Sequence, residues 1–238
     1  MGILVWEESL GWGDSEKSMT NPEFIRKQHE QTRLMVRNGI NHPSIIIWAF
    51  NNEGFANKPE TIPYYKGMVD LLHSEDSSRL ASFASCRLEA DLCIQFADVV
   101  SFNIYPGWMS NDWEHTKQLF EIEPRVNELG EFANRPDLKD KPLILSEIGC
   151  CGIYGYRDRV KARWSEEYQA DHMTESCRAV FANPRYSGLS LWQFYDSRTF
   201  ANGVIRTKGR GFNNAGILDE YRRPKLAFDA LKKFFHEN

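Results

Sequence analysis

The chain has 238 residues, of which 42% are hydrophobic and 26% are charged, and its formal net charge is −4. This composition is typical of a folded globular protein, and the length suffices for one domain with a sizeable core. The small negative charge, without any block of lysine and arginine, argues against nucleic acid or an acidic membrane surface as a partner.

Strands and helices alternate in the predicted order of elements. Short apolar runs predict six strands, near residues 2–6, 45–50, 80–84, 98–103, 142–147 and 188–194. Apolar residues at helical spacing, together with capping residues, predict the main helices near residues 22–38, 58–73, 120–132, 165–181 and 224–235. This alternation is typical of a parallel sheet covered by helices. The sequence therefore predicts an α/β fold with about six βα units.

The second predicted strand ends beside a candidate catalytic acid. Residues 45–50 form a nearly unbroken apolar run, which indicates a strand covered on both faces. Asn52 and Glu53 follow it directly. In α/β barrels the loops at the carboxyl ends of the strands carry the chemistry, so Glu53 stands where a catalytic acid is expected. The alternative is a surface glutamate that merely ends a strand.

The fifth predicted strand repeats this design. Residues 142–145 are mostly aliphatic, Glu147 follows them, and Gly149 allows the backbone to turn away. Two strand-end carboxylates in one chain suggest a pair that faces one pocket. Such a pair is what the cleavage of a glycosidic bond requires.

Three motifs together resemble glycoside hydrolase family 2, which contains β-galactosidases and β-glucuronidases. They are Asn52-Glu53, Ser146-Glu147 and the segment Gly188-Leu-Ser-Leu-Trp192-Gln-Phe194. The resemblance covers nearly the whole chain. It implies that residues 1–238 form a single catalytic domain of the (β/α)8 TIM-barrel type, the C-terminal part of such an enzyme. The implied activity is that of a retaining exo-β-glycosidase acting on β-hexosides of the galactoside or glucuronide type.

A complete TIM barrel has eight strands, whereas the sequence predicts six. The first strand, Gly-Ile-Leu-Val-Trp, looks like the third barrel strand of family 2 enzymes. The resemblance thus implies that barrel strands one and two, and the β-sandwich domains before them, are missing. An open sheet edge exposes unpaired backbone groups and apolar side chains, so we expect marginal stability, aggregation or pairing with a second copy through that edge.

The resemblance also assigns catalytic roles, which periodicity alone could not order. It makes Glu53 the general acid/base and Glu147 the nucleophile of a double displacement, in which the two carboxyl groups lie about 5 Å apart. The acid is expected to keep its proton through burial or through the neighbouring Glu147 charge. Asn52 is expected to hydrogen-bond the sugar 2-hydroxyl group.

Four further residues are candidates for substrate binding. By resemblance, Tyr105 donates a hydrogen bond to the nucleophile, and Trp192 forms a wall of the sugar subsite. The alternatives are a buried tyrosine satisfied by backbone groups and a core tryptophan. Trp108 and Glu8 are weaker candidates for the pocket lining, and Glu8 could equally pair with a basic residue at the rim.

The loop before the last helix bears on sugar specificity. Glucuronidases of this family carry an Asn-x-Lys motif there, whereas this chain has Asn213 followed at the lysine position by Ala215. Loss of that ammonium should weaken the recognition of a uronide carboxylate, so a neutral β-hexoside such as a galactoside is expected to be preferred. The upstream Arg206, Lys208 and Arg210 could compensate, although basic loops are usually just solvated.

The cysteines and the first residues indicate a cytoplasmic protein. Five cysteines without metal-like spacing look like reduced thiols, at positions Cys86, Cys93, Cys150, Cys151 and Cys177. We expect the adjacent Cys150 and Cys151 to be packing residues, although they could line the pocket. The first residues lack the pattern of a signal peptide, and no apolar run approaches the roughly 20 residues of a membrane span.

Three functions compete at this point. The first is an active retaining glycosidase, and the second is an inactive or sugar-binding part of such an enzyme that needs the missing strands. The third, a metal-dependent barrel hydrolase, has little support, because the six histidines are scattered and no metal-binding motif occurs. Accordingly, we expect a carbohydrate substrate and neither a metal nor another cofactor.

Overall fold

The computed structural model describes residues 2–108, 119–199 and 209–237. The chain divides into two compact units. The first comprises Met1–Asn103 and Glu131–Ile144, and the second comprises Ile104–Gly130 and Leu145–Asn238. The prediction of a single catalytic domain stays a prediction. None of the helices in the described ranges is both long and apolar enough to cross a membrane.

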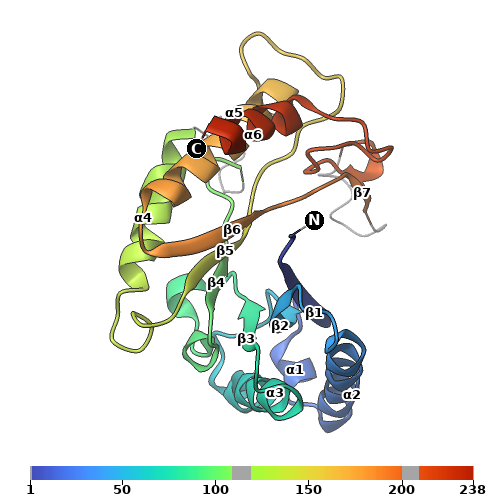
Figure 1. Cartoon of the computed structure of the whole chain (residues 1–238), viewed down its shortest axis with the longest axis vertical. Helices are drawn as coiled ribbons and strands as arrows, with labels where there is room; N and C mark the ends of the chain where they lie inside the picture. The colour runs from blue at the N-terminus through green and yellow to red at the C-terminus, as the bar shows by residue number, and fades with distance from the viewer. Residues whose placement is uncertain (1, 109–118, 200–208, 238) are drawn as a thin grey trace. The chain divides into compact units, whose positions relative to one another are not determined.

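The first unit is built on a parallel sheet of the order β1-β2-β3 (Figure 1). Its strands are β1 (Val5–Trp12), β2 (Ile45–Asn52) and β3 (Leu80–Ala84). Strand β4 (Val100–Asn103) continues the series, and Ser85 forms a parallel bridge with Phe102. Strands β2, β3 and β4 begin and end within two residues of their predicted ends, whereas β1 does not.

Strand β1 runs six residues beyond the predicted end at Trp6. Gly11 and Gly13 are typical turn residues and favour a loop in this segment. Instead β1 keeps pairing with β2 across an irregularity after Ser9, and Trp12 pairs with Asn52. Backbone pairing with a buried neighbour strand therefore outweighs the local preference for a turn, and it carries Trp12 to the end of β2.

Helices α1 (Glu16–Met19), α2 (Pro22–Gly39) and α3 (Ile62–Glu75) complete the first unit. Helix α2 begins as predicted, because Asn21 Oδ1 accepts hydrogen bonds from Glu23 N at 2.9 Å and Phe24 N at 3.3 Å. Helix α2 packs against β1, α3 packs against β3, and the two helices contact each other (Figure 1). Short 3-10 turns connect these elements, at Pro59–Thr61, Leu88–Ala90 and Ile94–Phe96.

Aromatic rings form the core of the first unit beneath the end of β2. Phe50 lies 5.5 Å from Phe83 between ring centroids, and Tyr65 lies 4.6 Å from Phe83. All three side chains are at most 1% exposed. Packed aromatic pairs of this kind contribute about 0.5–1.5 kcal/mol each beyond the burial of their area. Glu53, which follows β2, is therefore attached to a tightly packed part of the core.

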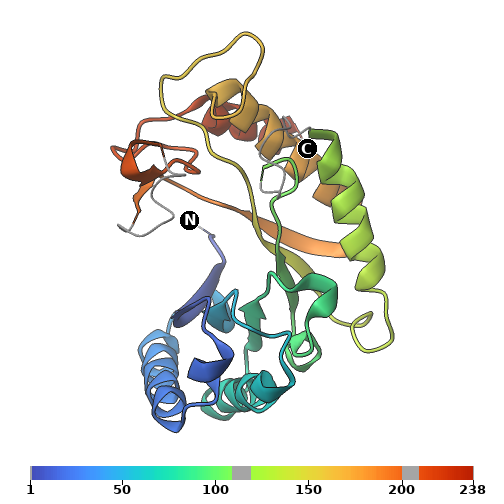
Figure 2. The same ribbon diagram turned by 180° about the vertical axis from the view of Figure 1, so that it is seen from behind.

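The second unit holds strands β5 (Leu143–Ile148) and β6 (Tyr186–Leu191), with β5 beginning in the first unit. Within its sheet, β5 lies next to β6. The helices are α4 (Ile122–Phe132), α5 (Glu166–Ala182) and α6 (Leu226–Glu237), and α5 and α6 lie side by side in both views (Figure 1 and Figure 2). The two-residue strands β7 (Ser197–Arg198) and β8 (Phe212–Asn213) pair antiparallel. Two further 3-10 turns lie at Leu119–Glu121 and Gly209–Gly211.

Candidate active site

Glu53 lies on a tight turn directly after β2. Asn51 and Glu53 both adopt positive φ angles, of 56° and 57°. Asparagine tolerates this left-handed region, but for glutamate it costs roughly 1–3 kcal/mol and must be enforced by the surroundings. One restraint is the hydrogen bond from Glu53 N to Ala84 O, at 2.9 Å, which ties the turn to the end of β3.

Arg87 supplies a second restraint on the same turn. Its Nε donates to Gly54 O at 2.9 Å, and its Nη2 donates to Glu53 O at 3.0 Å. The guanidinium group also lies 4.5 Å from the centroid of the Phe55 ring. The planar fork of an arginine can bind two neighbouring carbonyl groups at once, so Arg87 holds the turn in its strained conformation.

The Glu53 carboxylate accepts hydrogen bonds on both oxygens. Trp12 Nε1 donates to Oε2 at 3.0 Å, and Asn103 Nδ2 donates to Oε1 at 3.2 Å. Asn103 Nδ2 also donates to Asn52 Oδ1 at 2.8 Å. Asn103 therefore links the two neighbouring candidates Asn52 and Glu53 and fixes the orientation of both side chains.

Glu8 lies within β1, four residues before Trp12, and is exposed. Its Oε2 accepts a hydrogen bond from Trp6 Nε1 at 3.1 Å. The structure thus brings Asn52 and Glu53 together in the first unit but leaves Glu8 farther back along the strand.

Glu147 is the second last residue of β5 in the second unit. Tyr105 Oη donates a hydrogen bond to Glu147 Oε2, which is the contact that the resemblance implied for this tyrosine. Next to it in the chain, Ile104 N donates to Glu147 O at 2.9 Å. The segment after β4 therefore holds both the backbone and the side chain of Glu147.

Trp192 directly follows β6 and lies next to the end of β5. Its backbone N donates to Ile148 O at 3.0 Å, and its own carbonyl oxygen would lie 2.3 Å from a Cβ atom placed on Gly149. Any side chain at position 149 would push the two strand ends apart. Gly149 is thus required by a close approach of backbone rather than only by a turn.

Trp192 and Tyr105 pack against one buried cluster of the second unit. The members of this cluster are Trp108, Cys150, Cys151, Tyr168 and Ala215. Trp108 is only 6% exposed, with the Arg163 guanidinium 4.3 Å from its ring centroid and Trp164 packed edge-on. The ring of Trp108 is therefore mainly a packing element behind the candidate site. Cys150 and Cys151 are buried thiols, as the packing interpretation expected.

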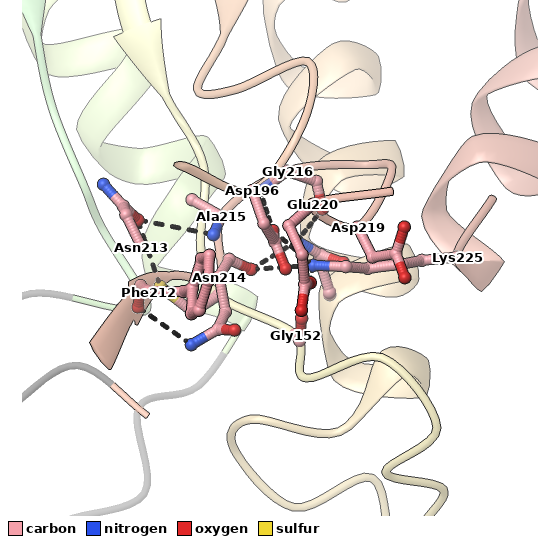
Figure 3. A network of polar contacts seen from close by, with 12 residues as sticks. Gly152, Asp196, Phe212, Asn213, Asn214, Ala215, Gly216, Asp219, Glu220 and Lys225 are labelled. Carbon is pink, nitrogen blue, oxygen red and sulfur yellow. Dashed lines mark hydrogen bonds and ion pairs between the residues drawn. The ribbon is translucent and has the colours of Figure 1, made fainter. Parts of the chain in front are cut away.

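The loop that carries Asn213 is braced by hydrogen bonds (Figure 3). Asn213 Oδ1 accepts from Ala215 N at 3.4 Å and from the Cys151 thiol at 3.9 Å. Ala215 is buried in the cluster, and the resemblance places the lysine of the family's glucuronidases at this position. Asn213, Trp192 and Tyr105 are thus connected through one cluster of the second unit.

Of the basic residues upstream of this loop, Arg210 forms an ion pair with Glu220 and lies near the Phe212 ring. Arg206 and Lys208 lie outside the described residues. Within the described ranges, no three His, Cys, Asp or Glu side chains form a group that could bind a metal ion.

A buried ion pair that the sequence did not reveal lies behind the Asn213 loop. Lys225 and Asp196 are both 0% exposed at their side chains, and Lys225 Nζ lies 2.7 Å from Asp196 Oδ1 (Figure 3). Burial raises the pKa of Asp196 to about 6, and burial lowers the pKa of Lys225. Removal of both groups from water is costly, so this pair must be held by precise hydrogen bonding.

Comparison with known proteins identifies the family. The family model described as "Glycosyl hydrolases family 2, TIM barrel domain" matches residues 5–237. The β-glucuronidase of Mus musculus is 29% identical over 236 residues, and the match covers 98% of this chain and 35% of that protein. The β-glucuronidase of Streptococcus agalactiae is 26% identical over 250 residues, with 98% and 40% covered.

Solved structures agree with this result. The crystal structure of a GH2 β-galacturonidase from Eisenbergiella tayi, bound to galacturonate, superimposes with a TM-score of 0.90 at 37% identity. It covers 99% of this chain, which in turn spans 41% of that protein. The chain thus spans about two fifths or less of the length of these relatives. The predicted α/β fold of an incomplete TIM barrel is confirmed, and the chain belongs to glycoside hydrolase family 2, of whose barrel domain it forms the matched part.

Proposed function

We propose that this chain carries the catalytic residues of a retaining exo-β-glycosidase that cleaves β-hexosides by double displacement. The observation that supports this most directly is the matched support of two strand-end glutamates. Trp12 and Asn103 hold the Glu53 carboxylate, and Tyr105 holds the Glu147 carboxylate. Catalytic groups need such fixed orientations, because small displacements cost large factors in rate.

In the proposed first step, Glu147 attacks the anomeric carbon and forms an ester bond to the sugar. The bond from that carbon to the leaving-group oxygen breaks, and Glu53 transfers its proton to this oxygen. In the second step Glu53 takes a proton from water, whose oxygen replaces Glu147 at the anomeric carbon. The sugar leaves with its original configuration.

The neighbouring residues support these two steps. The Tyr105 hydroxyl orients the Glu147 carboxylate for attack and stabilises this carboxylate again as it leaves the sugar in the second step, since hydrogen bonds to charged groups are strong. Asn103 fixes the Asn52 amide with its oxygen toward Asn103, and Asn52 would bind the sugar 2-hydroxyl group. Trp192, at the end of β6, would stack on the apolar face of the sugar.

For the sugar, we propose a β-uronide. Two of the relatives named above are β-glucuronidases, and the third, at 37% identity, is a β-galacturonidase that was crystallised with galacturonate. These relatives weigh against the neutral β-hexoside that Ala215 led us to expect. A galacturonide is our first candidate and a glucuronide the second, with the substrate carboxylate bound by a residue other than the one at position 215.

Hydrolysis of the p-nitrophenyl β-glycosides of galacturonate, glucuronate, galactose and glucose tests this proposal. We expect the highest kcat/KM for the galacturonide. The variant Ala215→Lys should raise kcat/KM for the glucuronide by roughly 1–3 kcal/mol of transition-state binding. A preference for the galactoside would instead support the neutral β-hexoside that was expected from Ala215. If none of the four glycosides is hydrolysed, the proposed activity is rejected.

A second candidate is a sugar-binding chain that turns over only when more barrel strands are present. It is favoured by strand β1, whose side chains Leu10 and Trp12 are 76% and 68% exposed. An exposed apolar edge of this kind can also pair with a second copy of the chain. The test is to add the preceding barrel strands of a relative and to measure turnover and oligomeric state. Unchanged activity of a monodisperse monomer would argue against this candidate.

The five cysteines fit the reduced thiols of a reducing compartment, and a cytoplasmic location is therefore part of this proposal.

A further inference from the structure

The Lys225 ammonium group makes three contacts in the buried interior of the second unit (Figure 3). Nζ donates to Gly152 O at 2.6 Å, to Asp196 Oδ1 at 2.7 Å and to Asn214 O at 3.0 Å. An ammonium group has three hydrogens, so these acceptors satisfy it completely. Lysine side chains usually lie at the protein surface, so a fully buried lysine suggests a specific role.

The three acceptors belong to three different segments of the chain. Gly152 follows the strand that carries Glu147, Asp196 follows the strand that precedes Trp192, and Asn214 lies next to Asn213. Each segment therefore carries one residue that the proposed function uses. Lys225 thus contacts all three segments.

Backbone hydrogen bonds strengthen the same connections. Gly152 N donates to Asn214 O at 3.0 Å, and Gln193 N donates to Ala215 O at 2.9 Å. Asp196 Oδ1 accepts a second hydrogen bond, from Gly216 N at 2.9 Å. A Cβ atom on Gly216 would lie 2.2 Å from Asp196 N, so the loop is pressed directly against this segment.

We infer that Asp196 and Lys225 form a positioning pair that sets the loop of residues 213–216 against the segments bearing Glu147 and Trp192. This inference rests on the proposed function and deepens it. Neither residue is assigned a contact with the substrate or a part in the proton transfers. The pair acts on substrate recognition through Asn213 and through the backbone around Ala215. By resemblance, position 215 is that of the lysine in the Asn-x-Lys motif of the glucuronidases.

A purely structural role predicts something different. If the pair only stabilised the second unit, its replacement by uncharged groups would lower the stability and leave substrate recognition unchanged in the folded molecules. Replacing a buried ion pair as a whole is often tolerated, whereas removing one partner leaves an unpaired buried charge. The clean test is therefore the double variant Asp196→Asn/Lys225→Met.

The second variant is Asp196→Asn alone, which keeps the volume and one oxygen acceptor. The matched control is Lys233→Gln. It breaks the Lys233–Glu237 ion pair on the exposed face of α6 in the same unit and leaves no buried charge without its partner. All variants are made in the full 238-residue chain and compared at equal folded fraction.

Two measurements decide the question. Amide hydrogen exchange should become about tenfold faster or more at residues 213–217 in the double variant, while β2 and α2 remain unchanged. For p-nitrophenyl β-galacturonide, KM should rise about tenfold and kcat should change less than about threefold. Asp196→Asn should show smaller shifts in the same direction, and Lys233→Gln should show none.

Unchanged exchange at residues 213–217 in a folded variant would overturn the inference, whatever happens to the melting temperature. An unchanged KM in an active variant would do the same. If the unmodified chain cleaves no uronide, the proposed function fails, but the exchange measurement still decides whether the pair positions the loop. If the double variant does not fold, Asp196→Asn carries the same comparison.

Discussion

The hydroxyl group of Tyr105 donates a hydrogen bond to the carboxylate of Glu147, although 42 positions separate the two residues in sequence. The adjacent backbone hydrogen bond from Ile104 N to Glu147 O keeps this contact in register. Tyr105 therefore has a fixed position relative to the proposed nucleophile. Removal of the Tyr105 hydroxyl group should therefore slow the chemical step more than it destabilises the fold.

For Tyr105→Phe we expect kcat on a good substrate to fall by roughly 10- to 100-fold, the equivalent of one hydrogen bond to a charged group. The ring stays in place, so the thermal midpoint should change little. Steady-state kinetics with p-nitrophenyl β-galacturonide measures the effect. Tyr156→Phe is the matched control, because Tyr156 is exposed and lies outside the site. An unchanged kcat would remove Tyr105 from the proposed mechanism.

The Glu53→Ala variant should distinguish substrates by their leaving group. An activated leaving group such as 2,4-dinitrophenol needs little protonation and should lose little rate, whereas a poor one should lose roughly 100- to 10,000-fold. The slope of log kcat/KM against the pKa of the leaving group measures this. Glu30→Gln, a change at an exposed glutamate on α2, should leave the slope unchanged. Equal losses for both classes in Glu53→Ala would show that Glu53 is not the acid.

The bidentate contact of Arg87 with the carbonyl groups of Glu53 and Gly54 suggests a related experiment. In Arg87→Lys the charge remains but the two-pronged contact is lost, so the turn should relax. We expect a loss of kcat on poor leaving groups that exceeds the loss on activated ones. Arg26→Lys on the exposed face of α2 serves as the control. A uniform loss with all leaving groups would indicate general destabilisation instead.

Much of this site could be predicted from local pattern, and the rest depends on pairing between distant segments. Strands β2 and β5 are apolar runs that end at polar residues, so Glu53 and Glu147 were visible in the sequence. Trp12 was not, because Gly11 and Gly13 favour a loop, and only the continued ladder with β2 carries it to Glu53. Asn103 ends a predicted strand, which is a signal that could have drawn attention to it.

Lys225 and Arg87 were missed for another reason. A lysine before an amphipathic helix is read as a solvated residue, since lysine is rarely buried without a partner. Its partner Asp196 lies 29 positions away, and nothing local indicates that the two meet. Likewise, the contacts of Arg87 are with backbone carbonyl groups, which leave no trace in side-chain patterns.

The buried His172 makes the stability of the second unit depend on pH. Burial lowers its pKa to about 4, and its Nε2 is hydrogen-bonded to Pro106 O at 2.8 Å. The unfolded chain, with an ordinary histidine pKa of roughly 6.5, binds more protons between pH 4 and 6.5. His172 therefore contributes stability that is complete above about pH 6.5 and is lost as the pH falls toward 4, by roughly 3 kcal/mol.

Urea unfolding at pH 7 and at pH 5 measures this effect. His172→Gln, which can keep a donor to Pro106 O, should lose less stability than the unmodified chain between the two pH values. His236→Gln is the control, because His236 is exposed in the last turn of α6. If His172→Gln and the unmodified chain respond alike, His172 is not the group responsible.

The central claim is that Glu147 forms a covalent bond to the sugar. Incubation with 2-deoxy-2-fluoro-β-galacturonosyl fluoride, followed by proteolysis and mass spectrometry, tests it most directly, because the fluorine slows breakdown of the intermediate. The account predicts one sugar attached to the peptide that contains Glu147, and no attachment in Glu147→Gln. Attachment at another residue, or turnover of the p-nitrophenyl galacturonide with inversion of configuration, would contradict it.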